Sequence, residues 1–207
     1  GTSTLTLNAG TGGMVTLGGA VGATTVLTGL NVTAGSFSAN ALNIGTGGLA
    51  VTTHASDITQ GGAFTVGGTS SFDAGTHAIT LDNTSNHCTG AVSLTNGGVH
   101  DATLDNGSHA LVLGDVHVGS GTLSVAGVGI TQAAGGTITQ TASAVAAQFN
   151  AGAGVLQLDK AKTLTCAVSL NNSGNHDVTL DNGTHALTLG TSTLGSGAFS
   201  LEGSGQT

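Results

Sequence analysis

The sequence AVSLTNGGVHDATLDNGSHALVLGDVHVGSGTLSV, residues 91–125, returns as AVSLNNSGNHDVTLDNGTHALTLGTSTLGSGAFSL, residues 167–201. The two copies align from end to end without a gap, and most of their differences are conservative. Upstream, FDAGTHAITLDN at residues 72–83 matches FNAGAGVLQLDK at residues 149–160. Self-similarity at a fixed period is the sequence signature of a repeat architecture. The chain is therefore expected to stack copies of one structural unit.

A shorter period lies inside this unit. Thr80–Asn83 (TLDN) returns as Thr103–Asn106, and Leu158-Asp159 returns as Leu180-Asp181. Both shifts fall within about 20–25 residues, a period that fits one coil of a solenoid. We therefore expect about three to four coils in each large repeat.

The segments between the turns alternate as β-strands do. Val92–Leu94 and Leu123–Val125 each place one polar residue between two apolar ones, and such runs end at Gly-rich and Asn-rich turns. The chain has 37 Gly and no Pro, Trp or Tyr, and it is poor in helix-forming residues. Its small aliphatic side chains suit the narrow bore of a β-helix. We predict an all-β fold, a right-handed parallel β-helix of about 20–25 residues per coil rather than a hairpin sandwich.

One continuous solenoid is expected over residues 1–207. ITQ tripeptides open two large units, about 58–129 and 130–205, and residues 1–57 are interpreted as a diverged partial unit. With about 4.8 Å between neighbouring strands, about nine or ten coils would form a rod on the order of 45 Å long.

Charge and hydropathy argue against several classes of partner. Two Lys stand against ten acidic residues, which gives a formal net charge of −8. A chain without a basic stripe is not expected to bind nucleic acid. Polar residues interrupt the apolar ones every one or two positions, so no membrane insertion is expected. The opening GTSTLTLNAG lacks the features of a signal peptide, so the sequence is interpreted as mature protein or an excised portion.

One string of motifs resembles a known family. ITQ is followed by GGAFTVGGTSSFDAG at residues 61–75, then by AITLDN, and then by GAVSL at residues 90–94. This order resembles the repeats of filamentous-haemagglutinin-like large exoproteins and related β-strand-repeat surface adhesins of bacteria. GATTVLTGLNVTAG, residues 22–35, is similar to a diverged coil of the same type. The resemblance implies a β-solenoid that is extracellular or on the outer surface of a bacterium, with host or surface glycans as a class of partner.

Three functions are considered, in descending order of expectation. The first is a structural stalk or fibre segment of an adhesin, a rigid rod rather than an enzyme, which meets adjoining repeats or other copies of itself through its ends. The second is a self-assembling extracellular fibre or matrix subunit that stacks head to tail. The third is a β-helical enzyme acting on polysaccharides, with Asp101 and Asp105, or Asp177 and Asp181, as paired carboxylates. Duplication of the pair and the lack of Arg, Trp and Tyr argue against this third function.

Histidines recur at matching positions. His77, His109 and His185 each lie between Ser or Thr and Ala, and His100 and His176 are each followed by Asp. Such side chains could hold a divalent cation. The copies are expected on one face of the rod, about three coils or roughly 14 Å apart, which is too far to share an ion. We therefore predict no metal, no cofactor and no catalytic residues.

Several turns that follow a strand carry an Asp residue. Four of them have the sequence LDN or LDK, at Asp82, Asp105, Asp159 and Asp181. They lack the nonapeptide spacing of calcium-binding repeats. Asp and Asn are instead expected to cap turns through the backbone, with Asn106-Gly107 and Asn182-Gly183 supplying left-handed conformations.

Cysteines and sequons complete the candidate list. Cys88 and Cys166 both come shortly before an AVSL strand, and their spacing in the sequence corresponds to about three coils. The expected separation of roughly 14 Å is too long for a disulfide. We predict two unpaired, inward-facing thiols. Sequons for N-glycosylation occur at Asn31, Asn83, Asn106, Asn171 and Asn182, where modification is left open. Thr triplets at the two ends of the chain do not recur on every coil, as an ice-binding face would demand.

Overall fold

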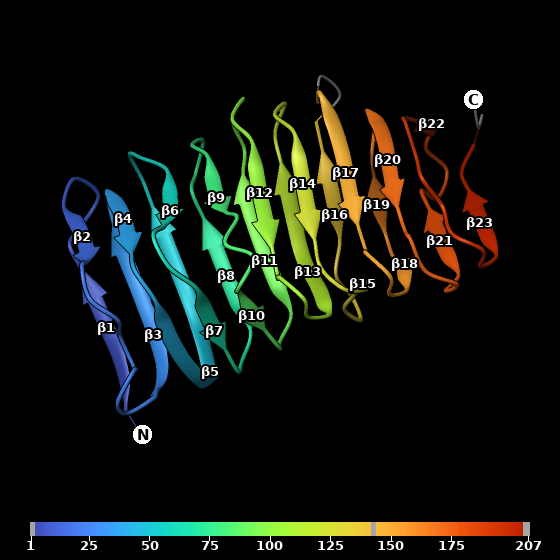
Figure 1. Cartoon of the computed structure of the whole chain (residues 1–207). Coiled ribbons are helices and arrows are strands. Elements are labelled where there is room, and N and C mark those ends of the chain that lie inside the picture. The colour runs from blue at the N-terminus through green and yellow to red at the C-terminus, as the bar shows by residue number, and fades with distance from the viewer. Residues whose placement is uncertain (1–2, 142–143, 205–207) are drawn as a thin grey trace.

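The computed structural model describes residues 3–141 and 144–204. Within these ranges the chain forms 23 β-strands and no helix. The strands pair in parallel and stack coil upon coil into a rod, with the two ends of the chain at opposite ends of the rod (Figure 1). The prediction of an all-β parallel β-helix is confirmed, and its right-handedness stays a prediction.

Two parallel sheets run along the rod. The nine-stranded sheet consists of β2 (Met14–Leu17), β4 (Ser36–Ala39), β6 (Ile58–Gln60), β9 (Ile79–Leu81), β12 (Ala102–Asp105), β14 (Leu123–Ala126), β17 (Ala146–Asn150), β20 (Ala167–Asn171) and β22 (Thr188–Leu189). The main path of the 14-stranded sheet consists of β1 (Thr4–Asn8), β3 (Leu27–Ala34), β5 (Leu42–Thr53), β8 (Ser70–Asp73), β11 (Val92–Asn96), β13 (Leu111–Val118), β15 (Ile130–Gln132), β18 (Leu156–Leu158), β21 (Val178–Asp181) and β23 (Phe199–Glu202). Its side branches are β7 (Phe64–Val66), β10 (His87–Cys88), β16 (Ile138–Gln140) and β19 (Lys162–Thr163).

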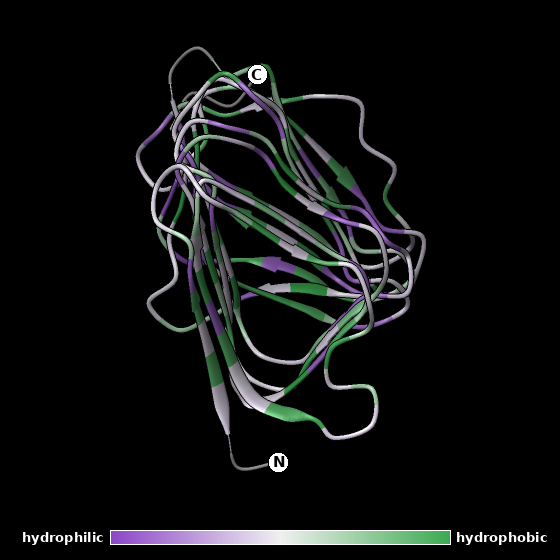
Figure 2. Ribbon diagram, turned by 90° about the vertical axis from the view of Figure 1, so that its left-hand side faces the viewer, coloured by the Kyte–Doolittle hydropathy of each residue, from purple (hydrophilic) through white to green (hydrophobic). Residues whose placement is uncertain are grey.

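The larger sheet divides into two rows because its long strands each pair with two shorter ones. β5 pairs with β7 through Leu42–Ile44 and with β8 through Leu49–Thr52. β13 pairs in the same way with β15 near its start and with β16 near its end. Together with the nine-stranded sheet, these rows give a coil with three strand segments. Viewed along the rod, successive coils superimpose around one interior (Figure 2).

The large sequence repeat is out of phase with the coil. On the nine-stranded sheet Ala102 pairs with Leu123, Leu123 with Ala147, and Ala147 with Val168, so three coils lead from Ala102 to Val168. The copy of Ala102 in the sequence repeat is Val178, which lies ten positions beyond Val168. A residue and its copy therefore lie on different segments of the coil.

The two copies of the 91–125 sequence consequently occupy different sheets. The first copy places β11 in the 14-stranded sheet and β12 in the nine-stranded one, whereas the second places β20 in the nine-stranded sheet and β21 in the 14-stranded one. The expectation that copies lie on one face was therefore wrong. Coil length also varies more widely than predicted, since the coil from Leu111 to Ile130 is seven residues shorter than the coil from Ile130 to Leu156.

The interior is filled by the apolar residue of each alternating pair. β12 has the burial pattern buried, half-buried, buried, half-buried, and most middle strands repeat it. Phe37, Phe64, Phe72 and Phe149 are all within 2% of full burial, and the rings of Phe64 and Phe72 stack with centroids 6.4 Å apart. Because each coil covers the next, these side chains form one continuous core along the rod.

Asp105 and Asp181 cap their turns, as predicted, whereas Asn83 rather than Asp82 caps the first of the four turns, and Asp159 contacts Gln157 and Lys160 instead. In a recurrent turn, a side-chain oxygen accepts a hydrogen bond from the backbone N–H two residues later, as Asp105 does from Gly107 at 2.7 Å and Asp181 from Gly183 at 2.6 Å. Gly107 and Gly183 have φ of 63° and 60°, which a residue without Cβ adopts at little cost. The preceding Asn106 does not share the left-handed conformation, since all positive φ values in the described chain belong to Gly.

Candidate functional site

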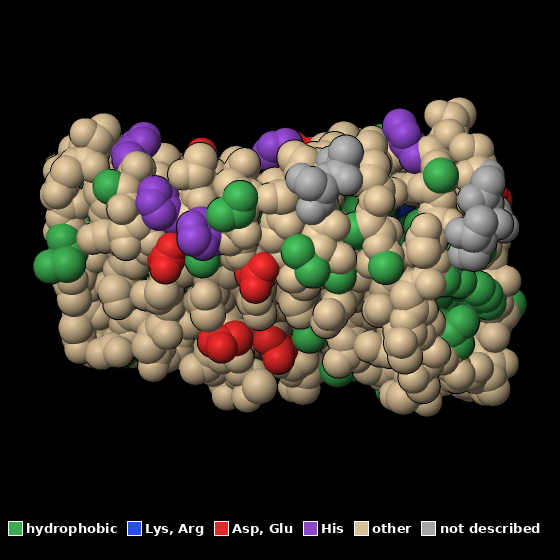
Figure 3. Space-filling view, turned by 90° about the horizontal axis from the view of Figure 1, so that it is seen from above, with side chains coloured by type: hydrophobic (Ala, Val, Ile, Leu, Met, Phe, Trp, Pro, Cys, Tyr) green, Lys and Arg blue, Asp and Glu red, His purple; other side chains and the backbone are tan. Residues whose placement is uncertain are grey.

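None of the matched histidines stacks on its own copy among the ring contacts of the described residues. His77 stacks on His100 of the neighbouring coil with ring centroids 6.3 Å apart, and His109 stacks on His87 at 3.6 Å. The third matched histidine, His185, instead contacts the Thr163 hydroxyl at 3.3 Å. Several histidines and acidic side chains share the upper face of the rod (Figure 3). Across the described residues, no group of three or more His, Cys, Asp or Glu side chains could hold a metal ion.

The candidate catalytic carboxylates are parts of the coil framework. Asp101 Oδ1 accepts the backbone N–H of Thr122 at 2.8 Å, and Asp177 Oδ1 accepts that of Ala198 at 2.8 Å, in each case from the next coil. Asp105 and Asp181, the second carboxylates of the two candidate catalytic pairs, each use one oxygen to cap their own turn. Each of these four carboxylates therefore has a structural hydrogen bond that connects or shapes coils.

Buried asparagine amides join neighbouring coils. Asn106, with no exposed surface, accepts the N–H of Cys88 at 2.7 Å and donates to the carbonyl oxygens of Cys88 and Ala110 at 3.2 and 2.6 Å. Asn182 forms the same pattern with Leu164, whose N–H and carbonyl both lie 3.0 Å away. The sequence analysis assigned these residues only to turns and sequons, because the sequence alone does not distinguish a buried Asn from an Asn in an exposed turn.

The five sequons differ in access. Asn106 and Asn182 are fully buried with their amides engaged, whereas Asn31 is exposed on β3, and Asn83 and Asn171 are half-buried. The amide nitrogens of Asn106 and Asn182 cannot accept a sugar while the coils remain stacked. The remaining three sequons, at asparagines that are exposed or half-buried, are the candidates for modification.

Cys88 and Cys166 are free and buried, which confirms the predicted unpaired, inward-facing thiols. Burial raises the pKa of both thiols, so neither is primed as a nucleophile. The two are not structural equivalents, however. Asn106 accepts the backbone N–H of Cys88, and Asn182 in the same way accepts that of Leu164. Leu164 is therefore the counterpart of Cys88, whereas Cys166 donates to Gln140 Oε1 at 3.1 Å.

A row made mostly of hydroxyl side chains follows the outside of the nine-stranded sheet, but Gln148 interrupts it, so hydroxyls do not recur on every coil. Register places on successive strands Thr16, Ser38, Thr59, Thr80, Thr103, Ser124, Gln148 and Ser169. The adjacent outward row is mixed, with Asp105, Ala126 and Asn150 in line. The sheet therefore carries one hydroxyl row, with no second one beside it in these coils.

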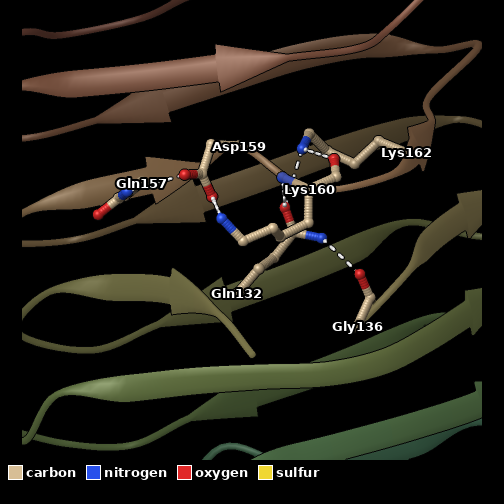
Figure 4. Close-up of polar contacts among 6 residues, drawn as sticks. All are labelled: Gln132, Gly136, Gln157, Asp159, Lys160 and Lys162. Atoms are coloured by element: carbon tan, nitrogen blue, oxygen red, sulfur yellow. Dashed lines mark hydrogen bonds and ion pairs between the residues drawn. The ribbon is translucent and has the colours of Figure 1, made fainter. Parts of the chain in front are cut away.

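The most unusual polar group, Lys162, lies inside the rod, between the two copies of the 91–125 sequence. In the earlier coils Gln60 and Asn86 exchange two amide hydrogen bonds, both 2.9 Å long. At the matching place Lys162 replaces the asparagine, and its Nζ donates to Gln132 Oε1 at 2.8 Å and to the carbonyl oxygen of Lys160 at 2.5 Å (Figure 4). Burial lowers the pKa of Lys162 to about 8, although the charges of Asp181 and Asp159 oppose this shift.

A groove of about 580 Å³ opens on the surface next to this lysine. It crosses three consecutive coils, since Thr139 pairs with Thr163 and Thr163 contacts His185. Its lining includes Lys160, whose Nζ forms an ion pair with Asp159 Oδ1 at 2.8 Å. The hydrogen bonds from Lys160 and then Gln157 lower the pKa of Asp159.

Residues 28–95 match the profile of a family described as repeats of unknown function (DUF5649). The matched span includes most of β3, all of β4 to β10 and most of β11, and thus overlaps the start of the first copy of the 91–125 sequence. No curated protein and no solved structure matches the chain. Fold and match together define a repeat protein built as a β-solenoid. In the described part of the chain, no helix is long and apolar enough to cross a membrane.

Proposed function

We propose that this chain is a segment of a structural rod, a stalk or fibre body that separates other parts of a surface or secreted protein. The observation that carries the proposal is the unbroken stacking of coils, since both sheets extend from the first coil to the last. Neighbouring strands are joined by backbone hydrogen bonds, and Asp and Asn side chains add further bonds between coils. Many parallel bonds around one packed core resist bending.

The distribution of polar residues also supports a framework role. Asp101 and Asp177, the strongest sequence candidates for chemistry, connect coils through backbone N–H groups. Asn106 and Asn182 do the same from the interior. A chain whose recurrent polar side chains have these structural partners is better suited to carrying load than to acid–base catalysis.

The adhesin context and the outer-surface location are part of the same proposal. Their support is the resemblance of the ITQ, AITLDN and GAVSL motifs to repeats of haemagglutinin-like exoproteins. The match to a family of repeats agrees with a repeated rod but assigns no role. The small number of charged residues and the abundance of Thr, Ser and Gly suit a chain that stacks many coils.

A second candidate is a fibre subunit that stacks end to end. Within the described structure, the edge strands of the two sheets are β1 and β2 at one end and β22 and β23 at the other. Apolar side chains are open there, with Met14 72% exposed and Phe199 42% exposed. Such edges pair readily with another strand, from an adjoining repeat or from a second copy.

Electron microscopy of the purified chain over a concentration series tests the proposal and separates the two candidates. Short rods of one length at all concentrations are expected for a stalk segment. Unbranched filaments that lengthen with concentration would favour the fibre subunit. Compact globules without an axis would contradict both.

A further inference from the structure

The only two positively charged side chains of the sequence line the same groove. The chain has two Lys and no Arg, and Lys160 and Lys162 both belong to the groove beside β19. The acidic residues of the groove are Asp159 and Asp181. Two cations and two carboxylates balance at this place, in a chain whose formal net charge is −8.

The groove presents both donors and acceptors. Lys160 is 40% exposed, and its ammonium group, with one N–H directed at Asp159, has two further N–H donors. Asp181 Oδ1 caps the turn at Gly183, which leaves Oδ2 without a hydrogen bond in the described structure. Thr184 and His185, both exposed, stand beside this carboxylate on the same turn.

We infer that this groove binds a neutral hexose unit of a glycan, with Asp181 accepting and Lys160 donating hydrogen bonds to its hydroxyl groups. A carboxylate accepts O–H hydrogen bonds while an ammonium group donates to hydroxyl oxygens, so the pair suits a diol, which both accepts and donates. The balanced charge gives no net attraction for an anionic sugar. A volume of about 580 Å³ is sufficient for a ligand of one or two sugar rings.

The expected affinity is low. No Phe, Tyr or Trp side chain lines the groove, so a sugar ring lacks the broad aromatic face on which sugars stack best. Hydrogen bonds at an open, solvated site contribute little each, which points to a dissociation constant on the order of 1 mM. The inference is independent of the proposed rod, which would stand without a ligand.

The repeat supplies a matched control. Asp105 is the copy of Asp181 in the first repeat, and it caps the same kind of turn through Gly107 at 2.7 Å, but it lies outside the groove. In Asp181→Asn and Asp105→Asn the amide oxygen can still accept the turn hydrogen bond, so both variants should fold alike. Only the first removes a groove carboxylate. Lys160→Met is a second test, since it removes the ammonium group.

The experiment titrates the isotope-labelled whole chain with methyl glycosides of glucose, galactose, mannose and N-acetylglucosamine, and with methyl galacturonoside as the anionic comparison, and follows amide shifts by NMR. At least one glycoside is expected to shift amides of residues 159–163 and 181–185. Asp181→Asn and Lys160→Met should weaken binding about tenfold or more, and Asp105→Asn should leave it unchanged. No shifts with any glycoside, shifts elsewhere, equal losses at Asp181 and Asp105, or preference for galacturonate would each overturn the inference.

Discussion

Replacement of Asn106 by Ala is expected to be among the most damaging single changes to this fold. The side chain is fully buried and makes three hydrogen bonds to backbone groups, one from Cys88 N–H and two to the carbonyls of Cys88 and Ala110. Alanine cannot reach any of them. The buried N–H and the buried carbonyl of Cys88 both lose their amide partner.

The magnitude follows from those groups. Each buried polar group left without a partner costs about 1–3 kcal/mol. Two such groups and a small cavity together give about 3–5 kcal/mol for Asn106→Ala. For a chain of this length the corresponding fall in unfolding midpoint is on the order of 10 °C.

Thermal unfolding followed by circular dichroism measures this loss, with urea unfolding as a second assay. Asn182→Ala should cost about the same, because Asn182 makes the equivalent bonds to Leu164. Asn83→Ala is the mild control, since that half-buried side chain is bonded only to Ser85 N–H, and its loss should cost below about 1 kcal/mol. If Asn106→Ala and Asn83→Ala unfold at the same temperature, the amide links between coils do not stabilise the fold as argued.

Three further predictions concern other parts of the rod. Burial lowers the pKa of Lys162 in the folded chain to about 8, from an unfolded value of 10.5, so between these pH values the unfolded state binds more protons than the folded state. The unfolding midpoint of the wild type should therefore rise relative to that of Lys162→Met from pH 8 to pH 10.5. A difference in midpoint that stays constant with pH would contradict this. Gly119→Ala should destabilise by about 1–3 kcal/mol in the same thermal assay, since an added Cβ would overlap the Gly98 carbonyl oxygen, while Gly12→Ala, with open space around it, should be neutral. Cys88 and Cys166 should react with a thiol reagent far more slowly in the native chain than in denaturant, because both are buried and their pKa values are raised; fast labelling of the native chain would show that they are accessible.

The elements of this fold could be predicted from sequence because they depend on local pattern. Alternation in Val92–Leu94 and in Leu123–Val125 marked strands that the structure contains. Asp105 and Asp181 cap the turns that their LDNG sequences indicated. Such features need only neighbouring residues, so a single sequence is sufficient to find them.

The placement of the copies could not be predicted in the same way, because it depends on the sum of coil lengths. The coil from Ile130 to Leu156 is four residues longer than the coil from Leu156 to Val178, and a few such residues change the face that a copy occupies. The histidines show the consequence: His77 meets His100 and His109 meets His87, rather than their own copies. No local signal indicates these pairs.

The groove was missed for a related reason. Sequence showed that Lys160 and Lys162 are close together, but not that Asp181 and His185 lie on the next coil beside them. Neighbours one coil apart become visible only when register is known. The inward direction of Lys162 was equally hidden, because its counterpart in the earlier coils is Asn86, a residue of different chemistry.

The register of the stacked coils is the central claim, and engineered disulfides between neighbouring coils test it most directly. Thr103 and Ser124 are paired on adjacent coils and are both half-buried on the outer side of the nine-stranded sheet. Neighbouring strands bring such residues to about 5 Å, within the range that a disulfide spans. The double variant Thr103→Cys with Ser124→Cys should therefore form an intramolecular disulfide under mild oxidation, whereas Thr103→Cys with Ala126→Cys, two residues out of register, should remain largely reduced. Equal cross-linking of both pairs, or cross-linking of the second alone, would contradict the coil register on which the whole account depends.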